Sequence, residues 1–312
     1  MPPELADITE SVSLTPDQYI GIPIALFGAI LISIGTQLQH TGVARVGAQA
    51  DTKAGLSIRQ LLALIAQPLW VFGTLMMGLA ILFQLTSLAF APLIVVQPLG
   101  AIALVVTAIV NSRQSGVRLT RKAVRAIVLC VGGVGLFVTI AAFTAKSSPI
   151  TELQLRIVLI ILAVVLVAFA VAFALLRKHF TPLFYVVGAG VLFGFVATLA
   201  KVVIDRVKTL SFSGFQLGPE EWLTVLCLVG LLVAALLGSY FVQSAYSNGP
   251  PDLVVAGLTV IDPLVAIAIG ILVLGEAAHA PLWAIFAFLI AGAIAIYGVL
   301  LLAKNHAKSV TE

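Results

Sequence analysis

Two polar residues, each followed by proline, lie at matching places in two long apolar segments. Gln97-Pro98 lies in IVVQPLGAIALVV, and Asp262-Pro263 lies in LTVIDPLVAIAIG. Because proline has no N–H, the carbonyls four residues earlier, those of Ile94 and Thr259, lose their helical donors. In transporters built from two inverted repeats, interrupted helices expose such polar groups to a substrate site near the middle of the bilayer. The two segments therefore predict an internally duplicated membrane transporter, with an amide in one repeat and a carboxylate in the other.

Asp262 is the strongest candidate for a functional side chain because it lies close to the middle of its apolar segment. A carboxylate at the bilayer centre costs about 2.5–3.5 kcal/mol on insertion scales, so something must offset that cost. Asp262 can alternate between a proton and a cationic group as two halves of a carrier move, or it can stay protonated and bond a neighbouring carbonyl. Gln97 can offer a donor and an acceptor to a substrate, or it can join two helices by a hydrogen bond.

Other polar residues are candidates for the substrate pathway or for its ends. Lys201 and Asp205 are four residues apart on one predicted helix, so they can pair with each other. Lys201 can instead extend to the membrane surface, or point inward to anchor an anionic group or to act as counter-ion to the central aspartate. Gln84 and Gln243 are expected to line the cavity. Glu276 follows an apolar segment in the sequence LGE, and we expect it to cap or pair at the membrane surface.

The composition is that of a membrane protein. Hydrophobic residues make up 61% of the 312 residues and charged residues 10%, against about 45–50% and about 25% in soluble domains. The excess of 17 basic over 13 acidic residues is small and scattered over short loops, so nucleic acid is not an expected partner. The sequence contains no nucleotide-binding glycine loop, metal-ligand cluster or nucleophile elbow, so we expect no cofactor, no metal centre and no enzyme activity.

Hydropathy predicts an all-α polytopic membrane protein with about nine transmembrane helices. The predicted spans are Tyr19–His40, Trp70–Phe90, Leu93–Val110, Val124–Phe143, Ile157–Leu176, Leu183–Ile204, Trp222–Val242, Leu253–Leu274 and Leu282–Leu302. A tenth span or an interfacial helix near residues 56–67 is left open. The fifth span has no polar side chain and should face lipid. Glycines in Gly132–Gly135 and Gly190–Gly194 predict close approach of helix backbones.

Positive charge predicts the orientation in the membrane. Twelve basic residues lie in loops or tails on one side: Arg45, Lys53, Arg59, Arg113, Arg118, Arg121, Lys122, Arg125, Arg177, Lys178, Lys304 and Lys308. Only four lie on the other side, namely Lys146, Arg156, Arg206 and Lys208. The side with more Lys and Arg is cytoplasmic, so the N-terminus is outside and the C-terminus inside.

The predicted organisation has four parts, and its two proline-containing spans cross the membrane in opposite directions, as inverted repeats require. An acidic extracytoplasmic tail covers residues 1–18, and the first repeat, of about four helices, covers residues 19–145. The second repeat, of about five helices, covers residues 152–304, and a cytoplasmic tail covers residues 305–312. The first tail lacks Lys and Arg, so the first span is expected to be retained rather than cleaved as a signal peptide.

Two long segments resemble known transporter repeats. Leu85–Val138 and Gln243–Val299 are similar to the second part of a drug/metabolite transporter (EamA-like) repeat, with a proline in mid-helix and a glycine-containing last helix. The first half resembles the NIPA-like magnesium-transporter branch of that superfamily more closely. That likeness is carried by Trp70, Gly73, Met77, the AFAP sequence at 89–92 and the VQPLG sequence at 96–100. The resemblance implies a fold of two inverted repeats and fits nine spans with an outside N-terminus.

The chain departs from the NIPA pattern in its second span, where Ile81 and Gln84 replace a glutamate and an asparagine. Mg²⁺ prefers several hard oxygen ligands, usually including carboxylates, so a single central acid favours another substrate. Our first expectation is therefore a secondary transporter that moves a small metabolite or amphiphilic compound by alternating access, with proton coupling through Asp262. Mg²⁺ transport is the alternative. A non-transporting scaffold or an accessory subunit of envelope biosynthesis is a third hypothesis, because fold does not fix function.

We expect the protein to lie in the inner (plasma) membrane, with the lipid bilayer and a small-molecule or ion substrate as its partners. A homodimer is left open.

Overall fold

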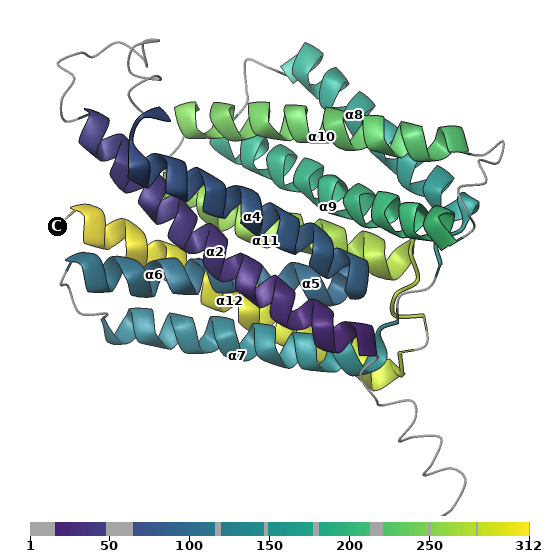
Figure 1. The fold of residues 1–312 in the computed structure, drawn as a ribbon, viewed down its shortest axis with the longest axis horizontal. Coiled ribbons are helices and arrows are strands. Elements are labelled where there is room, and N and C mark those ends of the chain that lie inside the picture. The colour runs from purple at the N-terminus through teal and green to yellow at the C-terminus, as the bar shows by residue number, and fades with distance from the viewer. Residues whose placement is uncertain are drawn as a thin grey trace, which may run out of the picture.

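The computed structural model describes residues 16–47, 65–115, 120–146, 149–176, 181–212, 221–248, 251–278 and 280–311. Within these ranges the protein consists of helices joined by short turns (Figure 1). The helices are α2 (Pro16–Gly47), α4 (Pro68–Phe90), α5 (Leu93–Leu99), α6 (Ile102–Ser115), α7 (Arg121–Thr144), α8 (Glu152–Leu176), α9 (Pro182–Phe212), α10 (Glu221–Asn248), α11 (Pro251–Leu272) and α12 (Leu282–Thr311).

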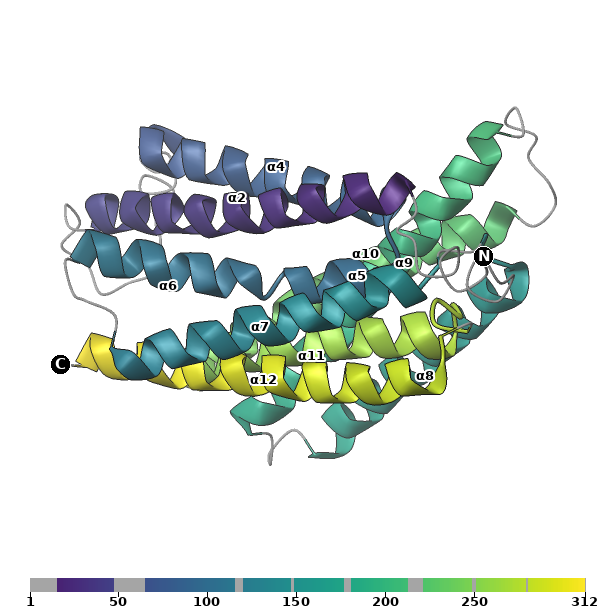
Figure 2. The same ribbon diagram turned by 90° about the horizontal axis from the view of Figure 1, so that it is seen from below.

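Nine stretches of the described chain are long and apolar enough to cross a membrane, with α5 and α6 together forming one of them. The predicted all-α polytopic class and its nine spans are confirmed, and each span lies where hydropathy placed it. The region near residues 56–67, where a tenth helix was left open, lies mostly outside the described residues. The first described turn of α2 and the last turn of α12 lie at opposite ends of the molecule, as an odd number of crossings requires (Figure 2).

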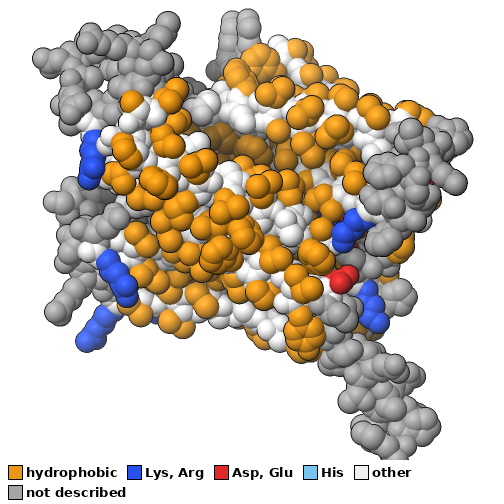
Figure 3. All heavy atoms as spheres, viewed as in Figure 1, with side chains coloured by type: hydrophobic (Ala, Val, Ile, Leu, Met, Phe, Trp, Pro, Cys, Tyr) orange, Lys and Arg blue, Asp and Glu red, His pale blue; other side chains and the backbone are white. Residues whose placement is uncertain are grey.

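The surface suits a bilayer. Large apolar side chains cover the middle of the molecule, and basic side chains gather at its two ends (Figure 3). On α8, the side chains of Ile160, Val164 and Val167 are all more than 60% exposed, whereas Val158 and Leu162 are buried. This helix therefore packs inward along one stripe only, and the rest of it faces lipid, as its lack of polar residues predicted.

The helices pack in matching pairs. In the first half α2 packs along α4 and against α6, and in the second half α9 packs along α10 and against α11. Between the halves, α7 packs along α12, and α5 packs against α11. Helix α8 contacts α9 and α10 and has no counterpart among the described helices of the first half.

Glycines allow close contact between α7 and α12. Of the glycines in the sequence 132–135, for which close approach was predicted, Gly133 lies at this contact, whereas a Cβ built on Gly132 or Gly135 would meet no atom within 4 Å. A Cβ built on Gly133 of α7 would lie 2.7 Å from the Cα of Ala295 in α12, and a Cβ on Gly298 of α12 would lie 2.7 Å from the Cα of Cys130 in α7. Both glycines thus face backbone atoms of the opposite helix. The contact between α7 and α12 consequently depends on glycine at these two positions, where any side chain would push the helices apart.

A central cavity between the two halves as candidate functional site

The third span is broken at its proline. Helix α5 ends at Leu99, and after it the Gly100 N–H donates to the Gln97 carbonyl at 3.2 Å, while the Ala101 N–H donates to the Pro98 carbonyl at 3.1 Å. These tight turns interrupt the α-helix directly after Pro98, which has no N–H to donate to the Ile94 carbonyl. In α11, by contrast, the helix continues through Pro263. The two repeats therefore share the proline but not the break.

The two proline motifs meet at a cavity of about 450 Å³. It lies between α2, α4, α5 and α6 of the first half and α9 and α11 of the second half. Figure 3 shows the apolar surface hollowed between α4 and α10. Four uncharged or acidic polar side chains line this central cavity: Gln84, Gln97, Thr259 and Asp262. Pro263 lines it too, so most of the predicted pathway residues lie together.

Asp262 is the single charged residue among those that line the central cavity. Its Oδ1 atom is buried and has no hydrogen-bond partner. A buried carboxylate oxygen without a partner is costly, so a proton or a cation that entered the cavity would be bound there favourably. Lys201, which could have been its counter-ion, does not line the cavity.

The other polar groups in the central cavity are neutral. The Gln97 side chain is 6% exposed, and Gln84 is half-buried on α4. The Thr259 hydroxyl donates to the Val255 carbonyl of its own helix at 2.8 Å, which leaves its oxygen lone pairs as acceptors. The cavity thus offers one carboxylate together with amide and hydroxyl oxygens. This is the ligand chemistry that hard cations prefer.

A second cavity, of about 300 Å³, lies on the other side of the same prolines. It is lined by apolar side chains of α7, α11 and α12, and it shares Ala101, Thr259 and Pro263 with the central cavity. Pro98 faces this apolar cavity and not the central one. The prolines therefore separate a polar space from an apolar one.

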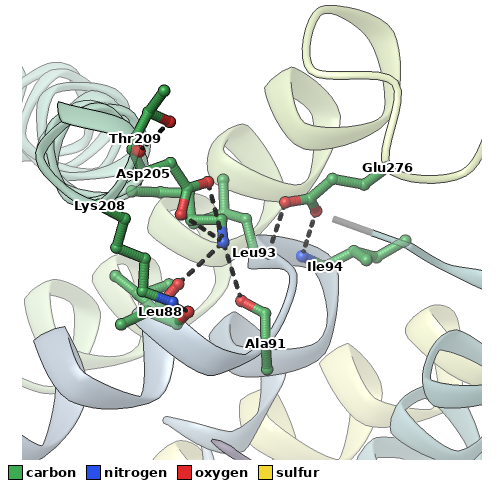
Figure 4. A network of polar contacts seen from close by, with 10 residues as sticks. Leu88, Ala91, Leu93, Ile94, Asp205, Lys208, Thr209 and Glu276 are labelled. Carbon is green, nitrogen blue, oxygen red and sulfur yellow. Dashed lines mark hydrogen bonds and ion pairs between the residues drawn. The ribbon is translucent and has the colours of Figure 1, made fainter. Parts of the chain in front are cut away.

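Three of the candidate residues from the sequence do not line the central cavity. Gln243 is exposed on α10 and lines neither cavity, because α10 packs at the edge of the molecule. Lys201 is 2% exposed and pairs with Asp205 at 3.1 Å, so it does not extend to the surface. Glu276 is 4% exposed, and its two carboxylate oxygens accept hydrogen bonds from the N–H groups of Leu93 and Ile94 at 2.7 and 2.8 Å (Figure 4).

The capping role predicted for Glu276 is therefore present, but in the interior and on a helix of the other half. Burial raises the pKa of Glu276 above its ordinary value, although its two backbone hydrogen bonds and the charge of Lys201 oppose the rise. This contact could not be predicted from the sequence, because Glu276 and Ile94 are 182 residues apart along the chain.

The part of the chain that the structure describes contains no group of three or more His, Cys, Asp or Glu side chains that could hold a metal ion. Cys130 and Cys227 are buried free thiols inside α7 and α10. A cation in the central cavity would consequently be held by one carboxylate and by neutral oxygens, and it would keep part of its water.

Comparison of the sequence with known protein families identifies the family of this chain. Residues 16–308 match the family described as magnesium transporter NIPA. The chain belongs to the NIPA family. This confirms the resemblance of its AFAP and VQPLG sequences to that branch of the drug/metabolite transporter superfamily. The NIPA match covers both halves of the chain, so the protein is a multi-pass membrane transporter.

Relatives of this NIPA family member occur in bacteria, animals and plants. An uncharacterized protein of Corynebacterium glutamicum is 27% identical over 287 residues, which are 92% of this chain and 95% of that protein. Mouse magnesium transporter NIPA4 is 26% identical over 192 residues, 59% of this chain and 46% of the mouse protein. The probable magnesium transporter NIPA6 of Arabidopsis thaliana is 25% identical over 226 residues, 70% of this chain and 67% of the plant protein. No solved structure matches the chain.

Proposed function

We propose that this NIPA family member transports Mg²⁺ through the central cavity, with Asp262 as the residue that binds the ion. The observation that carries the proposal is that Asp262 lines a cavity whose other described lining residues are uncharged, while its buried Oδ1 atom has no hydrogen-bond partner. Family membership and the names of the mouse and plant relatives favour Mg²⁺ over the small metabolite that we first expected from the missing second acid.

A single carboxylate is compatible with Mg²⁺ if the ion stays hydrated. Mg²⁺ gives up water reluctantly and is commonly held through one or two carboxylates while it keeps several waters. Six waters at about 30 Å³ each need roughly 180 Å³, and the central cavity measures about 450 Å³. The side chains of Gln84, Gln97 and Thr259 would then bind through water rather than directly. Ile81, which replaces the family's acid, also lines this cavity, so the pathway here is less negative on the α4 side.

Alternating access supplies the mechanism. The central cavity lies between the halves, so a movement of one half against the other would expose Asp262 first to one side of the membrane and then to the other. On the return step a proton on Asp262 would replace the ion, because an ionised carboxylate at this depth is costly. We propose that the protein acts in the plasma membrane, in the orientation that the positive-inside rule gives, with its N-terminus outside.

Flux measurements in proteoliposomes test this function. Purified protein is reconstituted with a Mg²⁺-sensitive dye inside, and influx is recorded with and without a pH gradient. We expect Asp262→Asn to lower the flux at least tenfold and to remove its dependence on the pH gradient. Gln84→Ala and Gln97→Ala should lower it less, because they remove neutral ligands only.

Two matched controls are available in the same chain. Gln243→Ala removes an amide that lines neither cavity, and Glu152→Gln removes an acid that pairs with Arg156 in the exposed first turns of α8. Both variants should transport as the wild type does. An Asp262→Asn protein with undiminished Mg²⁺ flux would refute the proposed role of this residue, and a wild-type protein without Mg²⁺ flux would refute the substrate.

A further inference from the structure

A cluster of charged side chains lies at one end of the central cavity, where α4 turns into α5. We call Lys201, Asp205 and Glu276 the outer polar cluster. All three residues belong to the second half of the chain, and they lie near the end of α4 and the start of α5, which by the charge rule is the extracytoplasmic side.

Lys201 bonds the end of α4 through its ammonium group. Its Nζ donates to the Leu88 carbonyl at 2.9 Å, to the Ala91 carbonyl at 3.4 Å and to Asp205 Oδ1 at 3.2 Å (Figure 4). An ammonium group has three N–H donors, so all of them are used. Lys208 lies two turns further along α9 and donates to the carbonyl of Ala89, which also belongs to the end of α4.

Glu276 holds the other side of this turn. It accepts hydrogen bonds from the N–H groups of Leu93 and Ile94, the first two residues of α5. The carbonyl of Glu276 also accepts a hydrogen bond from the Lys146 N–H at 3.0 Å, which follows α7 in the first half. The second half thus binds the segment from Leu88 to Ile94 through two kinds of hydrogen bond. Lys201 donates to its carbonyls, and Glu276 accepts from its N–H groups.

The outer polar cluster borders the central cavity at this end. Leu88 lines the cavity and gives its carbonyl to Lys201, while Ala200, the neighbour of Lys201 on α9, lines the cavity as well. Toward the opposite end, hydrogen bonds between Ser33 and Thr107 and from Gln37 to Asn111 join α2 to α6 within the first half. Among the described residues, the contacts of Lys201 and Glu276 with the first half therefore lie at the extracytoplasmic end.

We propose that Lys201 is a positioning residue that holds the extracytoplasmic end of the transport pathway shut, and that Glu276 does the same by binding the first N–H groups of α5. Opening to the outside requires α9 to move away from the end of α4, and that movement breaks the bonds of Lys201 to the Leu88 and Ala91 carbonyls. These carbonyls are buried, so breaking the bonds is costly until water reaches them. This inference rests on the proposed function only in taking the central cavity as the transport pathway.

Cysteine labelling from each side of the membrane tests the proposal without Mg²⁺ or flux. Ala197→Cys places a thiol in the lining of the central cavity, in a background that carries Cys130→Ala and Cys227→Ala. A membrane-impermeant thiol reagent is added to right-side-out and to inside-out vesicles, and the labelling rate is measured for each. We expect Lys201→Met to raise the rate from the extracytoplasmic side at least tenfold and to leave or lower the rate from the cytoplasmic side.

Arg156→Met is the matched control, because it removes an exposed basic residue near the same membrane surface and away from the cavity. It should label as the background protein does. Should Lys201→Met not be recovered as a folded protein, Glu276→Gln tests the same prediction with a smaller expected rise, since it keeps one acceptor for the two N–H groups.

Equal labelling increases from both sides would mean a loosened protein and would overturn the proposal, as would any pattern other than a rise confined to the extracytoplasmic side. Because labelling is measured without Mg²⁺, its outcome is independent of the Asp262→Asn flux experiment. The gating role of Lys201 and the Mg²⁺ substrate can therefore fail separately.

Discussion

Replacing Gly133 by alanine tests whether the two halves of the transporter are held together through backbone contact between α7 and α12. The new Cβ would lie 2.7 Å from the Cα of Ala295 and closer still to its N atom. Ordinary contacts between carbon atoms are about 3.5–4.0 Å. Neither partner atom belongs to a flexible side chain, so the helices themselves must separate, by about 1 Å.

The cost follows from the contacts that such a separation weakens. A gap of about 0.5–1 Å removes a quarter to a half of the attraction between two atoms, and each close pair contributes about 0.1–0.2 kcal/mol. If the interface holds as many close pairs as one well-buried leucine, about 40–60, the loss is roughly 3 kcal/mol. Alanine is a better helix former than glycine by up to about 1 kcal/mol. We therefore expect a net loss of about 2 kcal/mol for Gly133→Ala.

Thermal unfolding of the detergent-purified protein measures the effect, and Gly132→Ala is its control. A Cβ on Gly132 meets no atom within 4 Å, so this neighbouring substitution gains helix propensity without a clash. Its apparent Tm should equal or exceed that of the wild type, while that of Gly133→Ala should be lower.

The reasoning also predicts how two substitutions combine. Gly298→Ala clashes with the backbone of Cys130 in the same interface, and one separation of the helices relieves both clashes. The double variant should therefore lose less stability than the sum of the single losses. Equal stabilities of Gly133→Ala and Gly132→Ala would refute the explanation, and full additivity would refute the shared movement.

Three further predictions concern single polar contacts and one turn. Ser87→Ala removes the buried hydrogen bond to the Gly21 carbonyl, which is 2.8 Å long. It should cost about 0.5–1.5 kcal/mol, because that carbonyl lies inside α2 and keeps its helical partner. Thr86→Ala, which loses an exposed bond within its own helix, should cost less in the same unfolding assay. Burial raises the pKa of Glu276, so the folded protein binds this proton more tightly than the unfolded chain does. The stability that this proton contributes is thus present below the ordinary pKa of Glu and is lost as the pH rises through the raised pKa of Glu276. The Tm of the wild type relative to that of Glu276→Gln should fall over this pH range. Tm values of the two proteins that change in parallel with pH would contradict this prediction. Gly275 has a φ of +71°, so Gly275→Ala should cost about 1–2 kcal/mol of stability, and an unchanged Tm would show that the turn relaxes freely.

The sequence predicted the spans well because apolar length is a local property. Leu282–Leu302 was predicted to the residue, and Trp70–Phe90 differs from the observed span by two residues at one end. The pairing of Gln97 with Asp262 at one cavity also followed from sequence, since two matching proline motifs in inverted repeats must approach the same midplane.

Contacts between distant segments could not be predicted in the same way. Lys201 carries a formal charge, and near the end of a span the general expectation is extension to the surface. What keeps Lys201 buried is a set of carbonyls at the end of α4, more than 100 residues earlier in the chain. Likewise Gln243 is as polar as Gln84, but its helix lies at the edge of the molecule, so only the packing decides which of the two lines the cavity.

The presence of a single acid in the central cavity has an electrical consequence. With Mg²⁺ bound to an ionised Asp262, the loaded site carries a net charge of +1, and with a proton bound it carries none. Each cycle that exchanges the ion for one proton would then move one positive charge across the membrane. Over 100 mV, one charge is worth about 2.3 kcal/mol, which corresponds to a roughly 40-fold concentration ratio at about 1.4 kcal/mol per tenfold. In the proposed mechanism an inside-negative membrane voltage would therefore drive accumulation. In an Ile81→Glu variant, two acids that each take up a proton on the return step would exchange two protons for one Mg²⁺, and that cycle would carry no current.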